Sequence, residues 1–175
     1  EYLRPLVARD RIPFMSASYS RNLVNINEAP YNFLIGVTYS EQMKIVLRYV
    51  LEQARGMSRR PRVAFIYNET EFGRSPVPAG REYAANHGMD VVAEEVVSLD
   101  AREAKEQLMR IRNAKADYAV IQETAWAASV ILSDARRMGL STVFIGLNWC
   151  VDEKVVALSG ASAEGFVGVI PFEFT

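Results

Sequence analysis

Four apolar runs recur between Pro61 and Trp149: Arg62-Val-Ala-Phe-Ile-Tyr67, Val91-Val-Ala-Glu-Glu-Val-Val97, Asp117-Tyr-Ala-Val-Ile-Gln122 and Thr142-Val-Phe-Ile-Gly-Leu147. They are rich in β-branched and aromatic residues, and three of them are nearly continuous, which is typical of strands buried on both faces. The segments between them have helical spacing and are long enough for right-handed crossovers. This pattern predicts an α/β fold in which helices cover both faces of a parallel sheet.

Polar or aromatic residues follow each predicted strand directly. These positions hold Asn68-Glu69, Ser98-Leu99-Asp100, Glu123-Thr124 and Asn148-Trp149-Cys150. In open α/β sheets the ligand crevice lies outside the carboxyl ends of the strands. We therefore expect the functional edge of the sheet at these positions.

The composition excludes several classes of function. The net charge is −1 and the Lys and Arg residues are scattered, so the sequence has no electrostatic footprint for nucleic acid. No apolar run reaches the roughly 18 residues that a membrane span needs. The single cysteine excludes an internal disulfide and a thiolate metal cluster. We predict no cofactor, no metal, no nucleic-acid partner and no membrane span within this chain.

The residues before the repeat follow a different pattern, with short strands predicted at 12–15 and 31–35. Ser16-Ala-Ser-Tyr-Ser20 follows the first of them and suits a loop that offers hydroxyl and N–H groups to an anion, although composition alone favours an ordinary serine-rich turn. Two short strands cannot bury a core of their own. We expect them to be the edge of a second, incomplete lobe, and the sequence to be a piece of a longer protein.

Two capping boxes indicate where helices begin. Thr38-Tyr-Ser-Glu41 predicts a helix start, followed by an apolar stripe that ends near Gly56. Asp100-Ala-Arg-Glu103 predicts that Asp100 caps the helix after the second strand of the repeat. A last strand is predicted at 165–170.

Motifs for nucleotide binding and for a serine nucleophile are missing from the sequence. Cys150 has no histidine within plausible reach, because the only histidine, His87, is expected at the end of a helix. A hydrolase that uses Glu123 and Cys150 would need turnover that depends on the thiol. The remaining pattern is that of a small-molecule site, a few polar groups set beside aromatic walls. Its candidate residues are Asn68, Phe72, Gln122, Thr124, Trp126, Asn148 and Trp149.

Several stretches, in their order along the chain, resemble the branched-chain amino-acid type of periplasmic binding protein, the substrate-binding component of ABC importers. They are Ile12-Pro-Phe-Met-Ser-Ala-Ser-Tyr-Ser20, Tyr31-Asn-Phe-Leu-Ile-Gly36, Val63-Ala-Phe-Ile-Tyr-Asn-Glu-Thr-Glu-Phe-Gly73, Ala116-Asp-Tyr-Ala-Val120, Met138-Gly-Leu140, Phe144-Ile-Gly146 and Ala163-Glu-Gly-Phe166. The resemblance implies two Rossmann-like lobes that close on a ligand, no enzymatic activity, a periplasmic or extracellular location, and an ABC permease as membrane partner. An alternative from another class is the ligand-sensing domain of a receptor or transcriptional regulator with the same bilobed fold.

The resemblance also implies how the chain divides. Residues 1–37 would be the tail of lobe one, residues 38–170 the complete second lobe, and residues 171–175 the crossover returning to lobe one.

The family's pocket positions can be matched individually. The lobe-one loop that holds the ligand carboxylate matches Ser18, Tyr19 and Ser20, and a lobe-two aromatic residue matches Phe72. A second ligand-facing aromatic position holds Thr124, and the acidic position that pairs with a ligand ammonium holds Asn148. A buried ammonium without a paired carboxylate is costly, so Asn148 argues against an aliphatic amino acid unless Glu123 restores the charge. We expect a small carboxylate, amide or amino-acid-like ligand, with Trp149 as a further wall.

Overall fold

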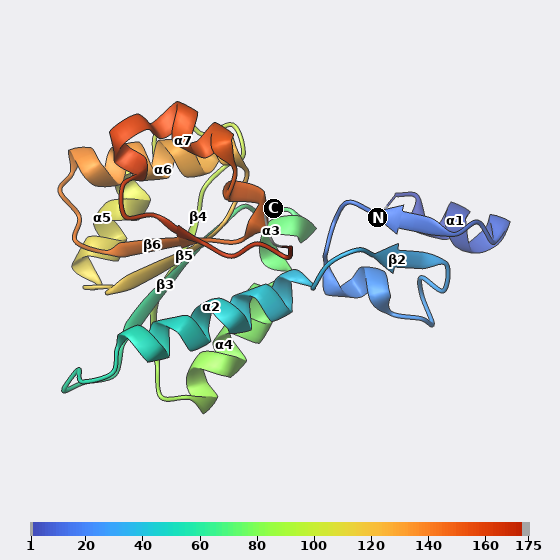
Figure 1. Cartoon of the computed structure of the whole chain (residues 1–175), viewed down its shortest axis with the longest axis horizontal. Helices are drawn as coiled ribbons and strands as arrows, with labels where there is room; N and C mark the ends of the chain where they lie inside the picture. The colour runs from blue at the N-terminus through green and yellow to red at the C-terminus, as the bar shows by residue number, and fades with distance from the viewer. Residues whose placement is uncertain (1, 173–175) are drawn as a thin grey trace.

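The computed structural model describes residues 2–172. Its main body is a parallel sheet of five strands in the order β4-β3-β5-β6-β7 (Figure 1). The strands are β3 (Arg62–Tyr67), β4 (Asp90–Val96), β5 (Tyr118–Gln122), β6 (Val143–Gly146) and β7 (Val167–Gly168). Every neighbouring pair is parallel, so the carboxyl ends of the strands meet at one edge. The predicted α/β fold with a parallel sheet is confirmed.

Helices cover both faces of this sheet (Figure 1). One face carries α2 (Tyr39–Gln53) and α4 (Val77–Asn86), and the other carries α5 (Lys105–Asn113), α6 (Ala125–Arg137) and α7 (Glu153–Ser159). Each face has its own core, because alternate residues of a strand point to opposite sides of the sheet. Val63 and Val120 pack on the α2 side, whereas Ile66 and Ile121 pack on the α6 side. Among residues 2–172, none of the helices is long and apolar enough to cross a membrane.

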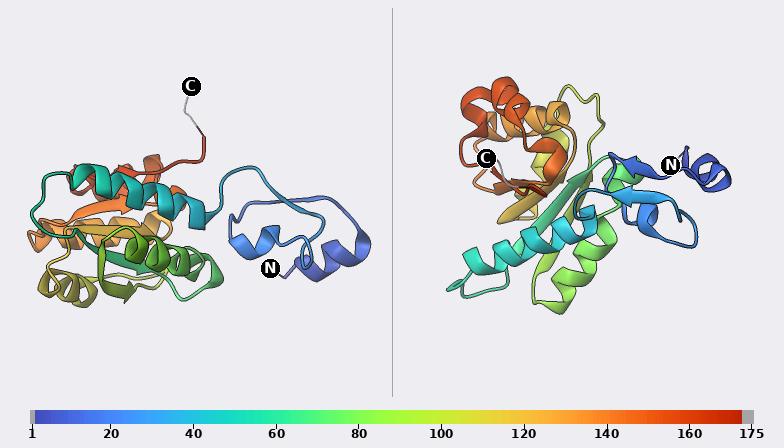
Figure 2. Two further views of the ribbon diagram at one scale, coloured as in Figure 1. Left: turned by 90° about the horizontal axis from the view of Figure 1, so that it is seen from below. Right: turned by 45° about the vertical axis from the view of Figure 1, so that its right-hand side comes forward.

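The residues before α2 form a small N-terminal unit beside the main body (Figure 2). It contains α1 (Arg4–Asp10), β1 (Phe14–Ser16), η1 (Arg21–Val24) and β2 (Asn32–Leu34). Strands β1 and β2 pair in parallel, which brings Met15 opposite Phe33. These two side chains are 65% and 51% exposed, so the apolar face of the small sheet is open.

The start of α2 agrees with its predicted capping box. Thr38 is the N-cap, and its Oγ1 accepts a hydrogen bond from the Glu41 N–H at 3.3 Å. Glu41 does not bond back to the cap and instead pairs with Lys44 at 2.8 Å. The first helical residue, Tyr39, donates its N–H to the Tyr19 carbonyl at 3.0 Å, which ties α2 to the N-terminal unit.

The second capping box was a wrong prediction. Helix α5 begins at Lys105, and its N-cap Ala104 donates its N–H to Oδ2 of Asp134 at 2.7 Å. Asp134 lies on α6, so a carboxylate from a different helix takes the role predicted for Asp100. The Asp100 carboxylate accepts a hydrogen bond from the Ser98 hydroxyl, which stabilises the loop before α5.

Two further elements differ from the prediction. A short helix, α3 (Glu71–Arg74), follows β3 and was not predicted, because four residues are too few to show a helical period. The last strand is only Val167–Gly168, because it pairs with just Ile145 and Gly146 of β6. Of the predicted return crossover 171–175, residues 173–175 lie outside the described residues.

Candidate functional site

An apolar cavity of about 300 Å³ lies where the N-terminal unit meets the carboxyl ends of β3, β5 and β6. The residues that line it are Ala17, Ser18, Tyr39, Phe72, Thr124 and Trp149. Ser18, Phe72, Thr124 and Trp149 were predicted as site residues from the sequence, and the fold brings them together. Ala17 and Tyr39 were not predicted.

Aromatic rings form most of the cavity wall. The Tyr39 ring meets Phe72 edge-on, with centroids 5.4 Å apart at 80°, and lies 5.8 Å from the Tyr19 ring. The indole Nε1 of Trp149 donates to the Tyr39 hydroxyl at 2.6 Å. Such contacts between rings fix their orientation as well as burying area. Tyr39 is therefore the centre of the wall, in contact with the N-terminal unit and with two loops of the main body.

Phe72 is held in place by the backbone of α3. The side-chain amide of Gln122, the last residue of β5, donates to the Phe72 carbonyl at 2.8 Å. Thr70 caps α3, since its Oγ1 accepts from the Gly73 N–H at 3.3 Å. The hydrogen bonds at the N-cap and at the Phe72 carbonyl hold this short helix in place, and its Phe72 side chain lines the cavity.

The predicted hydroxyl loop contributes Ala17 and only one hydroxyl residue, Ser18, to the cavity lining. Ser18 lines it, and the Ser18 and Ser20 hydroxyls lie 3.2 Å apart. Ser20 and Tyr19 are 3% and 6% exposed, so both lie behind the wall. Tyr19 acts there through its ring and through the carbonyl that accepts from Tyr39.

Glu123 lies behind the wall next to Thr124 and is completely buried. Its Oε2 accepts from the Asn68 amide at 3.1 Å, and its Oε1 has no hydrogen-bond partner. Burial raises the pKa of the Glu123 carboxyl to about 7, although hydrogen bonds from Asn68 and the Thr124 backbone oppose the shift. Glu123 does not line the cavity, but the next residue, Thr124, does, so a titratable carboxyl lies close to the cavity wall.

Asn148 is half-buried in η2 (Asn148–Cys150), directly before Trp149. Its N–H donates to the Gln42 side chain at 3.2 Å, whereas its own Oδ1 is buried and has no partner. Like Glu123, Asn148 does not line the cavity and offers an acceptor oxygen near it. The site therefore contains acceptor groups close to the wall that no other described residue satisfies.

Cys150 has no chemical role at this site. It is fully buried, and burial raises the pKa of its thiol to about 12. The thiol bonds to the Leu147 carbonyl, with Sγ and oxygen 3.2 Å apart. His87 lies at the end of α4, where its ring bonds to the Tyr83 carbonyl and stacks on the Tyr83 ring. A neutral thiol without a base is not a nucleophile.

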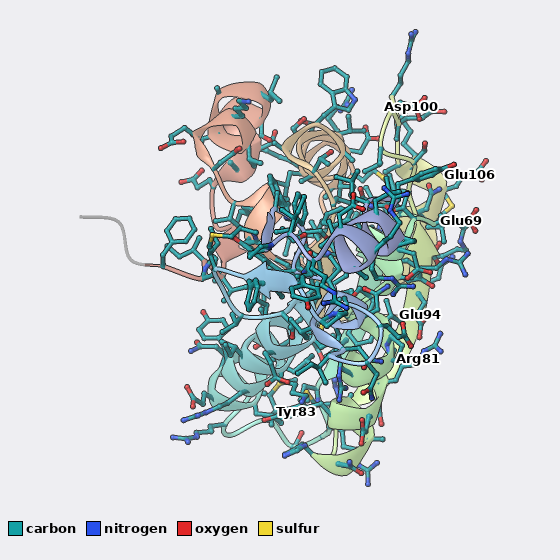
Figure 3. The ribbon with its side chains drawn as sticks, turned by 90° about the vertical axis from the view of Figure 1, so that its right-hand side faces the viewer. Glu69, Arg81, Tyr83, Glu94, Asp100 and Glu106 are labelled. Carbon is teal, nitrogen blue, oxygen red and sulfur yellow. The ribbon has the colours of Figure 1, made fainter. Side chains whose placement is uncertain are left out.

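The other predicted candidates do not line the cavity. Trp126 is half exposed and donates its Nε1 to the Ala101 carbonyl at 3.0 Å. Glu69 and Asp100 lie along the outer edge of the molecule with Arg81 and Glu94 (Figure 3). Glu69 pairs there with Arg74 at 3.0 Å, with its side chain 70% exposed.

A larger hollow, about 530 Å³, lies at the opposite edge of the sheet. Arg59, Arg112 and Asp117 are among its lining residues. The one carboxylate among these three residues is already paired, since Arg59 bonds to Asp117 at 2.7 Å. Because ligands of open α/β sheets bind at the carboxyl ends of the strands, the aromatic cavity is the better candidate site.

Comparison with solved structures gives close matches over nearly all of the chain. A branched-chain amino acid ABC transporter from Thermus thermophilus with bound valine is 31% identical over 95% of this chain, with a TM-score of 0.88. An ABC transporter substrate-binding protein from Aeropyrum pernix is 26% identical over 98% of it, with a TM-score of 0.87. The matches cover 43% and 44% of those two proteins, so this chain spans less than half of their length.

A fatty acid ABC transporter substrate-binding protein from Thermomonospora curvata shares the fold, with a TM-score of 0.81 at 18% identity. No curated protein sequence matched the chain. The family model described as periplasmic binding protein matches residues 1–173. The chain therefore belongs to the periplasmic binding protein family, a family of binding proteins rather than enzymes.

Proposed function

We propose that this chain is the ligand-binding part of an extracytoplasmic solute-binding protein of an ABC importer, located in the periplasm or outside the cell. The ligand is a small carboxylate, amide or amino-acid-like molecule. The observation that carries this proposal is the aromatic cavity between the N-terminal unit and the carboxyl ends of β3, β5 and β6. Residues 1–37 would then belong to the first lobe and residues 38–170 to the second, with residues 171–175 returning to the first.

The contacts between the two units support a hinge mechanism. Tyr39 bonds to Tyr19 across the junction, and the Arg21 N–H donates to the Ser75 hydroxyl at 3.4 Å. The segments at which the chain enters and leaves the main body also run close together, since a Cβ on Gly36 would lie 3.0 Å from the Cβ of Pro171. A ligand that contacts both lobes shifts such a hinge toward the closed form. The closed form would dock on the membrane permease.

Two residues behind the wall bear on the class of ligand. Asn148 carries no charge, so it cannot neutralise a ligand ammonium. Glu123 is a buried carboxyl with an unpartnered oxygen, and it could accept from an N–H donor of an amide or an amino acid. We propose that the ligand-binding residues of this chain are Ser18, Tyr19, Ser20, Phe72, Glu123, Thr124, Asn148 and Trp149.

A thermal-shift screen of the full-length protein tests the proposal. The three ligand sets are aliphatic amino acids, aromatic carboxylates, and small amides or ureas. A ligand at one hundred times its Kd stabilises the folded state by about 2.7 kcal/mol, which such a screen detects. We expect a shift with aromatic acids or amides, and a changed preference in the Asn148→Glu variant.

Two results would contradict parts of this proposal. A shift only with leucine or valine would mean that Glu123 or the rest of the first lobe supplies the missing charge. No shift with any set would contradict the proposed ligand class.

A further inference from the structure

Asn68 is a buried side chain directly after β3 that does not line the aromatic cavity. It is 2% exposed, and the two hydrogens and two lone pairs of its amide group are all engaged. Its Nδ2 donates to the Gln122 carbonyl at 3.5 Å and to Oε2 of Glu123 at 3.1 Å. Its Oδ1 accepts from the Thr70 N–H at 3.2 Å and from the Thr70 hydroxyl. Asn68 therefore joins the carboxyl end of β5 to the loop before α3.

Helix α3 packs directly on Asn68. Thr70, whose side chain bonds to Asn68, is also the N-cap of α3, where its Oγ1 accepts from the Gly73 N–H at 3.3 Å. Gly73 lies so close to Asn68 that an added Cβ would be 2.6 Å from the Asn68 Oδ1. Phe72, which lies between these two residues in the sequence, carries a ring that lines the cavity. The Asn68 side chain therefore helps to fix the helix that presents this ring.

Glu123 is the titratable partner of Asn68. It is 0% exposed, its Oε1 has no hydrogen-bond partner, and it does not line the cavity. The groups that face its carboxyl are the Asn68 amide, the Thr124 N–H and the Cys150 thiol of η2. Burial raises the pKa of the Cys150 thiol to about 12, so Glu123 is the group of this cluster that changes its charge near neutral pH. In this structure its charge reaches the cavity through the side chains bonded to it.

The charge on Glu123 changes the strength of these hydrogen bonds. An N–H···O bond to an ionised carboxylate is shorter and roughly twice as strong as a bond between neutral groups. Hydrogen bonds in a chain polarise one another, so a stronger bond from the Asn68 amide also strengthens the bonds that its carbonyl accepts from Thr70. Ionised Glu123 therefore holds α3 more firmly, although burial of the charge costs the fold as a whole free energy.

We propose that Asn68 is a positioning residue of the site, which couples the charge state of Glu123 to the position of the Phe72 ring through Thr70 and α3. This inference rests on the proposed function. It adds a residue outside the proposed ligand-binding set that controls the aromatic wall. The wall then differs between mildly acidic and mildly alkaline conditions.

Fluorine NMR on the full-length protein tests this coupling without a ligand. Phe72 is replaced by 4-fluorophenylalanine, whose resonance reports the position of the ring, because the ring lies edge-on to Tyr39 with centroids 5.4 Å apart. We expect the resonance to shift with pH in the wild type, with a midpoint near 7. The shift should be absent in Glu123→Gln, which keeps an acceptor oxygen but carries no charge. The same label at Phe144 of β6, in the core on the α6 side, is the control and should show no such midpoint.

Thr70 offers a matched pair of substitutions on this path. It is exposed, so a change there leaves no cavity in the core. Thr70→Val removes the hydroxyl at nearly constant volume, whereas Thr70→Ser keeps it. The pH-dependent shift at Phe72 should shrink in Thr70→Val and return in Thr70→Ser. In calorimetry at pH 8, Thr70→Val should bind the neutral probe phenylacetamide about 3- to 10-fold more weakly than the wild type, the usual effect of one lost hydrogen bond, and Thr70→Ser should bind it like the wild type.

The two measurements separate this inference from the proposed function. The inference is wrong if the Phe72 resonance does not titrate near pH 7, or if it titrates unchanged in Glu123→Gln or in Thr70→Val. Equal affinity of Thr70→Val and the wild type for phenylacetamide also overturns it, and the proposed function stands. If phenylacetamide does not bind the wild type, the amide part of the proposed ligand class is wrong, and the fluorine titration decides the inference.

Discussion

Glu123 is a carboxyl group buried without a positively charged side chain beside it. Burial raises its pKa to about 7, from the 4.5 of an ordinary Glu, so the folded state holds the proton more tightly than the unfolded state. The resulting stabilisation is present below about pH 4.5 and is lost as the pH rises through 7. We expect the wild type to lose about 2–3 kcal/mol of unfolding free energy between pH 5 and pH 8, relative to Glu123→Gln.

Urea denaturation at the two pH values measures this difference. Glu69→Gln is the matched control, since the Glu69 side chain is 70% exposed and its removal should leave the pH dependence nearly unchanged. Parallel pH curves for the wild type and Glu123→Gln would contradict the assignment of a raised pKa to Glu123.

Single residues show how far the sequence could predict the site. Phe72, Thr124 and Trp149 could be found because they follow predicted strands, and the carboxyl ends of parallel strands must meet. Tyr39 could not be found in that way. It is the first residue of a helix, within a capping box, and nothing in its local sequence shows that the fold turns its hydroxyl toward Trp149.

At the scale of elements, Asp134 connects two helices on one face of the sheet. It is 0% exposed; one carboxylate oxygen accepts from the Ala104 N–H at the start of α5, and the other accepts from Arg137 at 2.7 Å. We expect Asp134→Ala to lower the free energy of unfolding by about 2–4 kcal/mol, because a buried N–H loses a charged acceptor. Thermal or urea unfolding measures the loss.

The matched control for Asp134 is Glu106→Ala on α5 itself. The Glu106 side chain is 89% exposed and lies 4.0 Å from Arg110, so its removal should cost less than about 0.5 kcal/mol. Equal effects of the two substitutions would show that Asp134 does not cap α5.

The prediction that Asp100 caps α5 was wrong because the carboxylate at the start of this helix belongs to Asp134, on another helix. A cap can come from a residue 30 positions away, and sequence spacing reveals only local caps.

At the scale of the whole molecule, the four-fold repeat predicted the main sheet because β3, β5 and β6 contain runs of consecutive buried residues and the crossovers are helices. The shape of the N-terminal unit could not be predicted in the same way. Its strands have three residues each, and they show no period that would identify a buried face. The predicted first lobe, of which the N-terminal unit would be a part, therefore stays a prediction, supported by the chain spanning less than half of its solved relatives.

That prediction can be tested by hydrogen exchange on two lengths of the same protein. Met15 and Phe33 form an open apolar face on β1 and β2, and two short strands with an uncovered face should open readily. If the rest of the first lobe covers this face, amides of residues 14–16 and 32–34 should exchange at least about tenfold more slowly in the full-length protein than in residues 1–175 alone. Amides of β3 and β5 provide the internal control, because helices cover both faces of the main sheet and exchange there should be equal in the two proteins. Equal exchange in β1 and β2 as well would mean that the proposed remainder of the first lobe does not pack on this face, and the division into two lobes at residue 37 would have to be abandoned.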